Sequence, residues 1–236
     1  MKMNKIKFEK RAELDYRANE AYKTLRTNIQ FCGSDIKVIT FTSCTPNEGK
    51  SSVSFNLAVS FAQMGKKVIL IDADLRKSVM VGRYKVGAVE YGLTHYLSGQ
   101  NELDEVMLET DIENMDVIFA GTFGPNPAEL LEHQRFHDMV GMLREVYDYV
   151  LIDTPPLGSV IDSALVAKIS DGAVLVIESN AISYRFAKDV KAQLEKSNCR
   201  ILGAILNKVQ LEKKGYYGKY YGKYYGKYYG TYGNDN

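Results

Sequence analysis

The sequence predicts an α/β fold, an open parallel sheet flanked by helices and followed by a disordered tyrosine-rich tail. Apolar, β-rich runs alternate along the chain with helix-like stretches, and this alternation indicates right-handed crossovers between parallel strands. Most of the runs are continuously apolar, as expected where helices cover both faces of a sheet. With 236 residues, of which 45% are hydrophobic, the chain is long enough for one such domain with a sizeable core.

The elements follow one another in a regular order. Strands are expected at residues 37–43, 67–72, 116–120, 148–153, 172–178 and 200–206. Helices are expected between them at residues 51–64, 127–147, 161–170 and 184–197, and a further helix at about 17–31 precedes the first strand. In open α/β sheets ligands bind at the carboxyl ends of the strands, so we expect the functional side chains there.

The last 22 residues differ in composition from the rest of the chain. Nine of the 17 tyrosines lie there in a Tyr-Tyr-Gly-Lys repeat that holds no aliphatic residue. Glycine at every fourth position opposes helix and strand, and nothing aliphatic is present to build a core. The sequence therefore predicts a folded domain over residues 1–214 and a flexible tail over residues 215–236. The tail tyrosines are Tyr216, Tyr217, Tyr220, Tyr221, Tyr224, Tyr225, Tyr228, Tyr229 and Tyr232.

Charge and composition exclude several classes of protein. The net charge of +1 comes from 30 basic and 29 acidic residues, so the chain lacks the overall basic field of a nucleic-acid-binding protein. Three cysteines, Cys32, Cys44 and Cys199, show no CxxC spacing and predict neither a disulfide framework nor a zinc site. No apolar run reaches the roughly 18 residues of a membrane helix, and the basic N-terminus lacks the apolar stretch of a secretory signal. A reducing cytosol is the expected environment.

A phosphate-binding loop is predicted after the first strand. Residues 43–51 read Ser-Cys-Thr-Pro-Asn-Glu-Gly-Lys-Ser and lead into a helix, with Cys44 at the position of the usual first glycine. Backbone amides of such a loop and the positive end of the helix attract phosphate, while Lys50 adds a charge and Ser51 a hydroxyl for Mg²⁺. The alternative is a polar loop that only caps a helix. The candidate nucleotide-binding residues of this loop are Thr45, Pro46, Asn47, Glu48, Gly49, Lys50, Ser51 and Ser52.

Two carboxylates and an arginine follow the second strand. Asp72 and Asp74 are two residues apart, so on an extended strand end they share one face. That arrangement is costly unless a cation or a proton lies between the carboxylates. The alternative is that Asp74 caps the next short helix and pairs with Arg76, which explains only one of the two carboxylates.

A third carboxylate, Asp153, ends the fourth strand. Its place after an apolar run is that of the second magnesium-side group of P-loop enzymes, with Ser51 providing the first contact. The loop, the carboxylate pair and Asp153 together predict a Mg–nucleotide site in a P-loop NTPase-like domain. Asn207, after the last strand, is a candidate for the adenine edge because an amide can bond that edge bidentately; a turn residue is the alternative.

With these motifs the chain resembles the bacterial tyrosine kinases of capsule and exopolysaccharide systems. More narrowly, it resembles the cytoplasmic kinase subunit whose membrane activator is a separate chain. The resemblance spans almost the whole sequence. It rests on the block at residues 20–31, the loop ending Glu-Gly-Lys-Ser, the Asp72-x-Asp74-x-Arg76 motif, the sequence Leu-Ile-Asp-Thr-Pro-Pro at 151–156, the sequence Pro-Asn-Pro-Ala-Glu-Leu at 125–130, and the tyrosine cluster.

The resemblance implies an ATP- and Mg²⁺-dependent kinase that phosphorylates its own tail tyrosines, in trans within an oligomer, and regulates polysaccharide synthesis. In the family the first aspartate of the second motif lies near the attacking tyrosine hydroxyl, which implies Asp72 as base or orienter. Asp74, Asp153 and Ser51 are implied around Mg²⁺. Such chemistry depends mainly on positioning and on neutralising charge around the γ-phosphate. The implied catalytic set is Lys50, Asp72, Asp74, Arg76 and Asp153.

The family also assembles into rings through a Glu-x-x-Arg-x-x-Arg helix. This implies an oligomer interface at Glu20, Lys23 and Arg26. Lysine replaces the middle arginine here, and because lysine cannot make the planar bidentate contact of arginine, a weaker ring is implied. A solvated charged face is the alternative for this helix.

Further partners follow from the resemblance alone. It implies a separate transmembrane activator of the polysaccharide co-polymerase type and a cognate phosphotyrosine phosphatase. No nucleic-acid partner is expected. The chain is expected to work in the cytoplasm, recruited to the inner face of the cell membrane by its activator.

Other functions stay open at this level. Membrane-partitioning and plasmid-segregation ATPases of the deviant-Walker type share the fold and act as dimerisation switches without phosphorylating protein, but their loop carries an extra lysine where this chain has Thr45. A dinucleotide-binding oxidoreductase is disfavoured because no GxGxxG follows the first strand. A non-catalytic scaffold is a further alternative, with a tail that self-associates through tyrosine stacking and cation–π contacts.

Overall fold

The computed structural model describes residues 4–11 and 13–210. The predicted tail, with its nine candidate phosphoacceptor tyrosines, lies outside the described residues. The domain boundary at residue 214 therefore stays a prediction.

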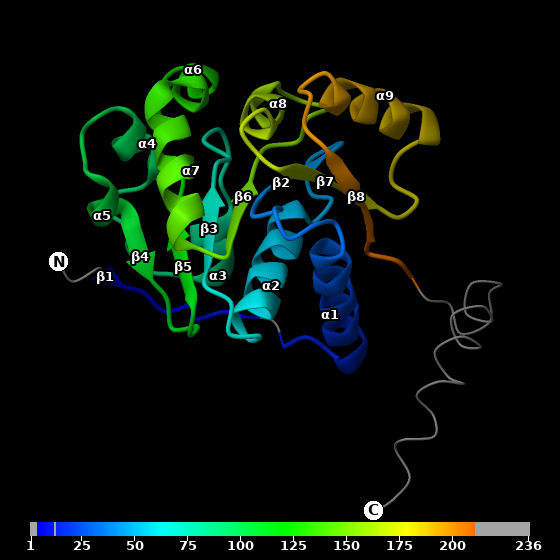
Figure 1. The fold of residues 1–236 in the computed structure, drawn as a ribbon, viewed down its shortest axis with the longest axis horizontal. Helices are drawn as coiled ribbons and strands as arrows, with labels where there is room; N and C mark the ends of the chain where they lie inside the picture. Colours follow the sequence, from blue (N-terminus) through cyan, green and yellow to red (C-terminus); the bar gives the residue numbers. More distant parts are fainter. Residues whose placement is uncertain (1–3, 12, 211–236) are drawn as a thin grey trace, which may run out of the picture.

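A single sheet forms the centre of the described part of the chain (Figure 1). The strand order is β1-β4-β5-β3-β6-β2-β7-β8, and every pair of neighbours is parallel except β4 and β5. The strands are β1 (Asn4–Lys5), β2 (Val38–Ser43), β3 (Val68–Asp72), β4 (Met107–Glu109), β5 (Met115–Ile118), β6 (Tyr149–Asp153), β7 (Gly172–Glu178) and β8 (Ile201–Asn207).

Helices cover both faces of the sheet, as alternate residues of β3 show. Val68 and Leu70 pack in one apolar cluster with α2, whereas Ile69 and Ile71 pack in another with α7. Burial on both faces explains why this strand has a continuous apolar sequence. The helices are α1 (Tyr16–Gln30), α2 (Lys50–Ala62), α3 (Met80–Tyr84), α4 (Leu93–Leu97), α5 (Leu103–Val106), α6 (Pro127–Glu132), α7 (Gln134–Val146), α8 (Asp162–Ala167) and α9 (Tyr184–Glu195).

The predicted strands and the N-terminal helix are confirmed to within two residues at each end. The helix predicted at 127–147 is instead two helices, because His133 adopts an extended backbone between them. The His133 side chain accepts a hydrogen bond from the amide of Arg135 at 3.2 Å and so caps the start of α7. Strands β1 and β4, with two and three residues, are too short to give a pattern in the sequence.

The sheet departs from a purely parallel arrangement at one place. Strands β4 and β5 are antiparallel, with Met107 opposite Ile118 and Glu109 opposite Asp116. Only residues 110–114 join the two strands. Because a parallel crossover needs about a dozen residues or more, a link this short returns the chain as a hairpin.

The central strands bring the predicted site together. Strand β6 lies between β3 and β2, and Asp153 of β6 stands opposite Asp72 of β3 and Phe41 of β2. The loop after β2, the carboxylates after β3 and Asp153 therefore share one edge of the sheet, as the carboxyl-end rule predicts. None of the helices within residues 4–11 and 13–210 has the length and apolar character of a membrane span.

Candidate active site

The loop between β2 and α2 has the backbone of a phosphate-binding turn. Asn47 and Gly49 both have positive φ, at 68° and 90°, and Gly49 directly precedes the helix. A Cβ atom on Gly49 would lie 2.2 Å from the side-chain nitrogen of Asn207. Glycine is therefore required here both for its left-handed conformation and for this close approach.

Glu48 shapes this loop from the inside. Its carboxylate is buried and accepts hydrogen bonds from the amides of Cys44 and Thr45, both at 2.7 Å, and from the amide of Glu178 in β7 at 3.2 Å. The side chain is thus engaged within the protein and is not available to a ligand. Burial, together with the Glu48 carboxylate, raises the pKa of the Cys44 thiol to about 12, so this cysteine stays protonated.

Replacing Glu48 by alanine is expected to weaken nucleotide binding by at least about tenfold. The change leaves three buried or half-buried amides without their acceptor, at a cost of about 1–3 kcal/mol for each unsatisfied group, and frees the loop from β7. Titration calorimetry with Mg–ATP measures the affinity. The control is Glu113→Ala, an exposed carboxylate between β4 and β5. An unchanged affinity for Glu48→Ala would contradict this account of the loop.

Lys50, the first residue of α2, lies among carboxylates at the sheet edge. Its Nζ donates to Asp153 Oδ2 at 3.0 Å and to Ser51 Oγ at 3.1 Å, and it lies 4.0 Å from Asp74 Oδ2. The ammonium is therefore a cation close to Asp74, and its charge also acts on Asp72. Lys50, Ser51 and Asp153 are all buried, so these interactions are little screened by solvent.

The donor set around Asp153 fits a hydrated Mg²⁺. Among the described residues, no three His, Cys, Asp or Glu side chains come together as a metal cage. In P-loop sites Mg²⁺ keeps waters and phosphate oxygens and takes only one or two protein groups. Asp153 Oδ1 is buried and finds no hydrogen-bond partner within residues 4–11 and 13–210, which leaves one carboxylate oxygen to meet such a shell. Ser51, Asp153 and Asp74 are the residues that would hold the ion.

Asp72 is an unusually basic carboxylate. Burial and the negative charge of Asp153 raise its pKa to about 7, against the lowering effects of a hydrogen bond from Ser78 and the charge of Lys50. Its two oxygens accept from the Ser78 hydroxyl and from the amide of Asp74, the latter at 3.2 Å. The side chain is thus held in one orientation next to Lys50. Burial also raises the pKa of Asp153, although Lys50 opposes this effect.

Arg76 has a different partner from the one considered in the sequence. Its guanidinium makes a two-point contact with Asp162, Nε to Oδ2 at 2.7 Å and Nη2 to Oδ1 at 2.9 Å. Asp162 is fully buried and begins α8, whereas Arg76 is partly exposed. Asp74 instead accepts from the amide of Lys77 at 3.0 Å and closes the turn after β3. Arg76 is thereby held in place by α8, while 38% of its side-chain surface stays exposed.

Asn207 lies under the phosphate loop. Its side-chain nitrogen donates to the carbonyl of Glu48 at 2.9 Å. Next to it, Lys208 Nζ donates to the carbonyl of Asn47 at 2.7 Å and to Glu178 Oε2 at 2.9 Å. The end of β8 therefore supports the loop directly, and the contact of Asn207 with an adenine edge stays a prediction.

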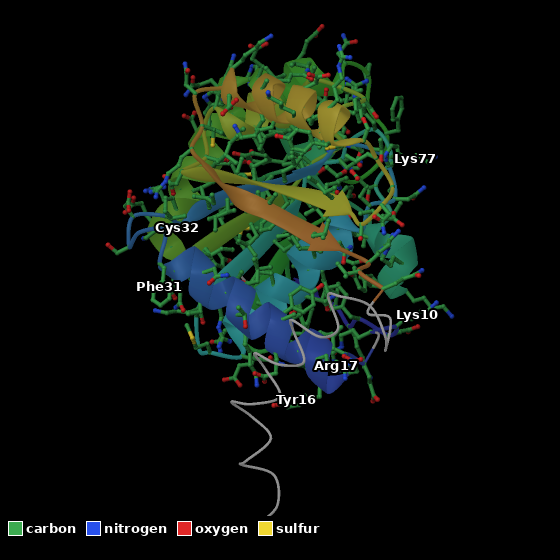
Figure 2. The ribbon with its side chains drawn as sticks, turned by 90° about the vertical axis from the view of Figure 1, so that its right-hand side faces the viewer. Lys10, Tyr16, Arg17, Phe31, Cys32 and Lys77 are labelled. Carbon is green, nitrogen blue, oxygen red and sulfur yellow. The ribbon has the colours of Figure 1, made fainter. Side chains whose placement is uncertain are left out.

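The residues predicted for an oligomer interface lie on α1, which Figure 2 views from outside, with Tyr16 and Arg17 near its start and Phe31 just past its end. Lys23 pairs with Glu20 at 2.7 Å on the exposed face. Arg26 instead donates to the carbonyl of Ser60 in α2 at 2.6 Å. Within the helix only Ile29 is fully buried, while Tyr22 and Leu25 are partly buried against the same core.

Four contributing residues were missed by sequence reasoning: Asp162, Ser78, Arg83 and Lys208. Arg83 of α3 donates to the hydroxyl of Ser52 in the first turn of α2. Asp162 could have been identified from the sequence, because it is a carboxylate in the first turn of a helix that follows a Pro-Pro pair. No local sequence pattern identifies the other three, because their contacts depend on which loops the topology places side by side.

Comparison with known proteins agrees with this geometry. The family model described as AAA domain matches residues 36–202. The tyrosine-protein kinase CpsD of Streptococcus agalactiae is 43% identical over 202 residues, covering 86% of this chain and 88% of that protein. The crystal structure of the chimerical protein CapA2B2 superposes with a TM-score of 0.79 at 30% identity, covering 86% of this chain and 93% of that one. The kinase domain of Escherichia coli tyrosine kinase ETK gives 0.77 at 33% identity, covering 84% and 80%.

Proposed function

Since this chain belongs to the bacterial tyrosine-protein kinases, we propose that it transfers the γ-phosphoryl group of Mg–ATP to the tyrosines of its own C-terminal tail. It is a protein-tyrosine kinase of the capsule-synthesis type. The observation that carries the specific assignment is the buried cluster of Lys50, Asp72 and Asp153 beside the phosphate loop. The nine tail tyrosines are the acceptor groups that the same chain supplies.

The loop residues bind the triphosphate. Amides between Asn47 and Ser52 and the positive end of α2 attract phosphate oxygens, and Lys50 supplies a mobile charge. Bound Mg²⁺ neutralises charge on the phosphate oxygens of the leaving group and the transferred group. Ser51, Asp153 and Asp74 are the residues that would hold that ion. Thr45, Pro46 and Glu48 complete the loop, and Asn207, at the end of β8, is proposed to contact the adenine.

Asp72 acts on the acceptor. Its raised pKa and its fixed orientation suit a carboxylate that accepts, or aligns, the proton of an attacking hydroxyl near neutral pH. Arg76, held by Asp162, is placed to stabilise charge on the transferred group. Catalysis then consists mainly of positioning, as expected for phosphoryl transfer.

The alternative, a deviant-Walker ATPase switch, is less well supported. It shares the fold and the loop, so the architecture alone does not separate the two functions. The distinguishing features are Thr45 in place of the extra lysine and the tyrosine repeat, for which a switch ATPase has no use. Relatives at 43% and 40% identity carry the tyrosine-protein kinase name.

Transfer is proposed to occur in trans within a ring-like homo-oligomer that uses Glu20, Lys23 and Arg26. The exposed surface of α1 supports this interface, although Arg26 is bonded to Ser60 within the same chain. We further propose a separate transmembrane activator, a cognate phosphotyrosine phosphatase and a position at the inner face of the membrane. A solved chimera named CapA2B2 is among the similar structures.

A mixing experiment tests transfer in trans. One full-length chain carries Lys50→Met and an intact tail, and the other keeps the active site but has its nine tail tyrosines replaced by phenylalanine. Incubation with Mg–ATP, with and without the cytoplasmic end of an activator, is expected to place phosphate on the Lys50→Met chain. Mass spectrometry of the separated chains measures this. An unphosphorylated Lys50→Met chain in the mixture, while the parent chain alone gains phosphate under the same conditions, would overturn transfer in trans.

A further inference from the structure

An exposed aromatic surface lies beside the active site and takes no part in the chemistry described above. Phe123, in the loop between β5 and α6, is 74% exposed, and Tyr91, just before α4, is 38% exposed. The ring of Tyr91 meets that of His95 edge-on at 5.5 Å, and His95 Nε2 lies 3.3 Å from the hydroxyl of Thr122, next to Phe123. These side chains therefore form one surface built from two loops.

The loops that carry this surface are held in place by close backbone contacts. A Cβ atom on Gly92 would lie 2.5 Å from the carbonyl oxygen of Phe119, and one on Gly124 would lie 2.7 Å from Thr94. The amide and hydroxyl of Thr94 both bond the carbonyl of Ala120, at 3.0 and 2.9 Å. These contacts fix the backbone on both sides of Phe123, while its ring stays exposed.

The position of this surface is on the acceptor side of the active site. Strand β5 lies next to β3, with Ile118 opposite Ile71, so the chain that follows β5 flanks Asp72 and Asp74. The phosphate loop after β2 lies on the other side of β6. In phosphoryl transfer the attacking and leaving oxygens are roughly in line with the transferred group. The loop after β5 therefore lies on the far side of Asp72 from the phosphate loop, which is the side that an in-line acceptor would use.

The charge of this region complements that of the tail. The two segments that carry the aromatic surface, residues 86–95 and 119–130, contain Glu90 and Glu129 and no lysine or arginine. Both carboxylates are exposed, and Glu129 accepts a hydrogen bond from Asn126 of the Phe123 loop at 3.2 Å. The tail carries three lysines and one aspartate, and its repeat presents two tyrosine rings for each lysine.

We propose that Glu90, Tyr91, His95, Phe123 and Glu129, here called the acceptor platform, bind the Tyr-Tyr-Gly-Lys repeats in the tail of a second copy of the chain. The proposal rests on the proposed function and adds the surface that selects its acceptor. Tail tyrosines stack on Phe123 and Tyr91, and tail lysines pair with the two carboxylates. One tyrosine of the repeat is thereby presented to Asp72 while its neighbours stay bound to the platform.

The same surface accounts for release of the product. Each phosphate adds about −1.5 to −2 charges to a tyrosine at neutral pH. A phosphorylated repeat is repelled by Glu90 and Glu129, so the tail leaves the platform as it is modified. The platform therefore favours unmodified repeats over finished ones.

Steady-state transfer in trans tests the platform. The acceptor is the full-length Lys50→Met chain, and the catalyst is the full-length chain whose nine tail tyrosines are phenylalanine. Phe123→Ala and Glu129→Lys in the catalyst are each expected to raise the KM for the acceptor chain about fivefold, with kcat and the KM for ATP unchanged. The matched controls are Phe31→Ala, since Phe31 is 83% exposed past the end of α1, and Glu113→Lys, which makes the same charge change between β4 and β5.

The outcomes separate the platform from the kinase activity. A raised acceptor KM in the two platform variants, with both controls like the parent, supports the proposal. An acceptor KM equal to the parent value in both platform variants overturns the platform and leaves the kinase function standing. A parent pair that consumes ATP without transferring phosphate overturns the proposed function and the platform together.

Discussion

Lys50→Met is expected to abolish tail phosphorylation and to destabilise the fold at the same time. The ammonium group contacts Asp153 at 3.0 Å in a buried position, and its removal leaves that carboxylate without its cation. Breaking a buried ion pair from one side costs about 3–5 kcal/mol. Loss of the charge at the phosphates lowers transfer by at least about 100-fold. Intact mass after incubation with Mg–ATP measures the first effect, and chemical denaturation measures the second.

A double variant separates the two effects of this change. Lys50→Met combined with Asp153→Asn removes both charges, so stability is expected to recover by about 2 kcal/mol or more relative to Lys50→Met alone. Phosphorylation is not expected to recover, since the phosphates still lack their lysine. Tail phosphorylation by either variant at the parent rate would contradict the role assigned to Lys50.

Asp72→Asn is expected to lower phosphoryl transfer by about 100-fold or more while leaving Mg–ATP affinity within about twofold of the parent. Asparagine keeps the size of the side chain and loses the carboxylate that faces the acceptor. Within residues 4–11 and 13–210, the hydrogen bonds that the Asp72 carboxylate accepts come from Ser78 and Asp74 and not from the phosphate loop. Single-turnover kinetics with saturating ATP measures the transfer step, and titration calorimetry measures the affinity.

Ser78→Ala provides the matched control for this variant. It removes one donor to Asp72 and leaves the carboxylate in place. A loss of only about threefold in transfer is expected, because the orientation is weakened while the acceptor group remains. Equal rates for Asp72→Asn and the parent would show that this carboxylate does not act on the tyrosine hydroxyl.

The parts of the site that the sequence predicted share one property: each is local. The loop from Ser43 to Ser51, the Asp72-x-Asp74 pair and Asp153 all follow apolar runs directly, so the carboxyl-end rule alone places them together. The parallel register then sets Asp72 opposite Asp153. The continuously apolar strands were also a local pattern. They predicted a sheet with helices on both faces, because burial on both faces removes the alternation of apolar and polar residues.

The parts that escaped prediction depend on contacts between distant segments. Arg76 finds Asp162, which is 86 residues away, and Glu48 bonds the amide of Glu178 in another strand. From the sequence, a glutamate in a phosphate loop is expected to face the ligand. In the structure Glu48 is buried, and its carboxylate holds the turn from inside. The β4–β5 hairpin was missed because three-residue strands leave no periodic pattern.

The acceptor platform also could not be found from pattern alone. Tyr91 and Phe123 are 32 positions apart in the sequence, and contacts of His95, Gly92 and Thr94 with the loop after β5 bring their surroundings together. An isolated aromatic residue in a loop is ordinary in a sequence. Phe123 differs from an ordinary loop residue because its ring is exposed and because its loop follows β5, the strand that pairs with the Asp72 strand β3.

The central claim is that this phosphate loop serves transfer to the tail, and intact mass of the full-length chain tests it most directly. The parent chain is incubated with Mg–ATP, alone and with an activator fragment, next to Lys50→Met and the chain whose nine tail tyrosines are phenylalanine. The account predicts mass gains in whole multiples of one phosphate for the parent and none for either variant. ATP hydrolysis by the parent without any gain in mass would contradict it and would identify a switch ATPase instead.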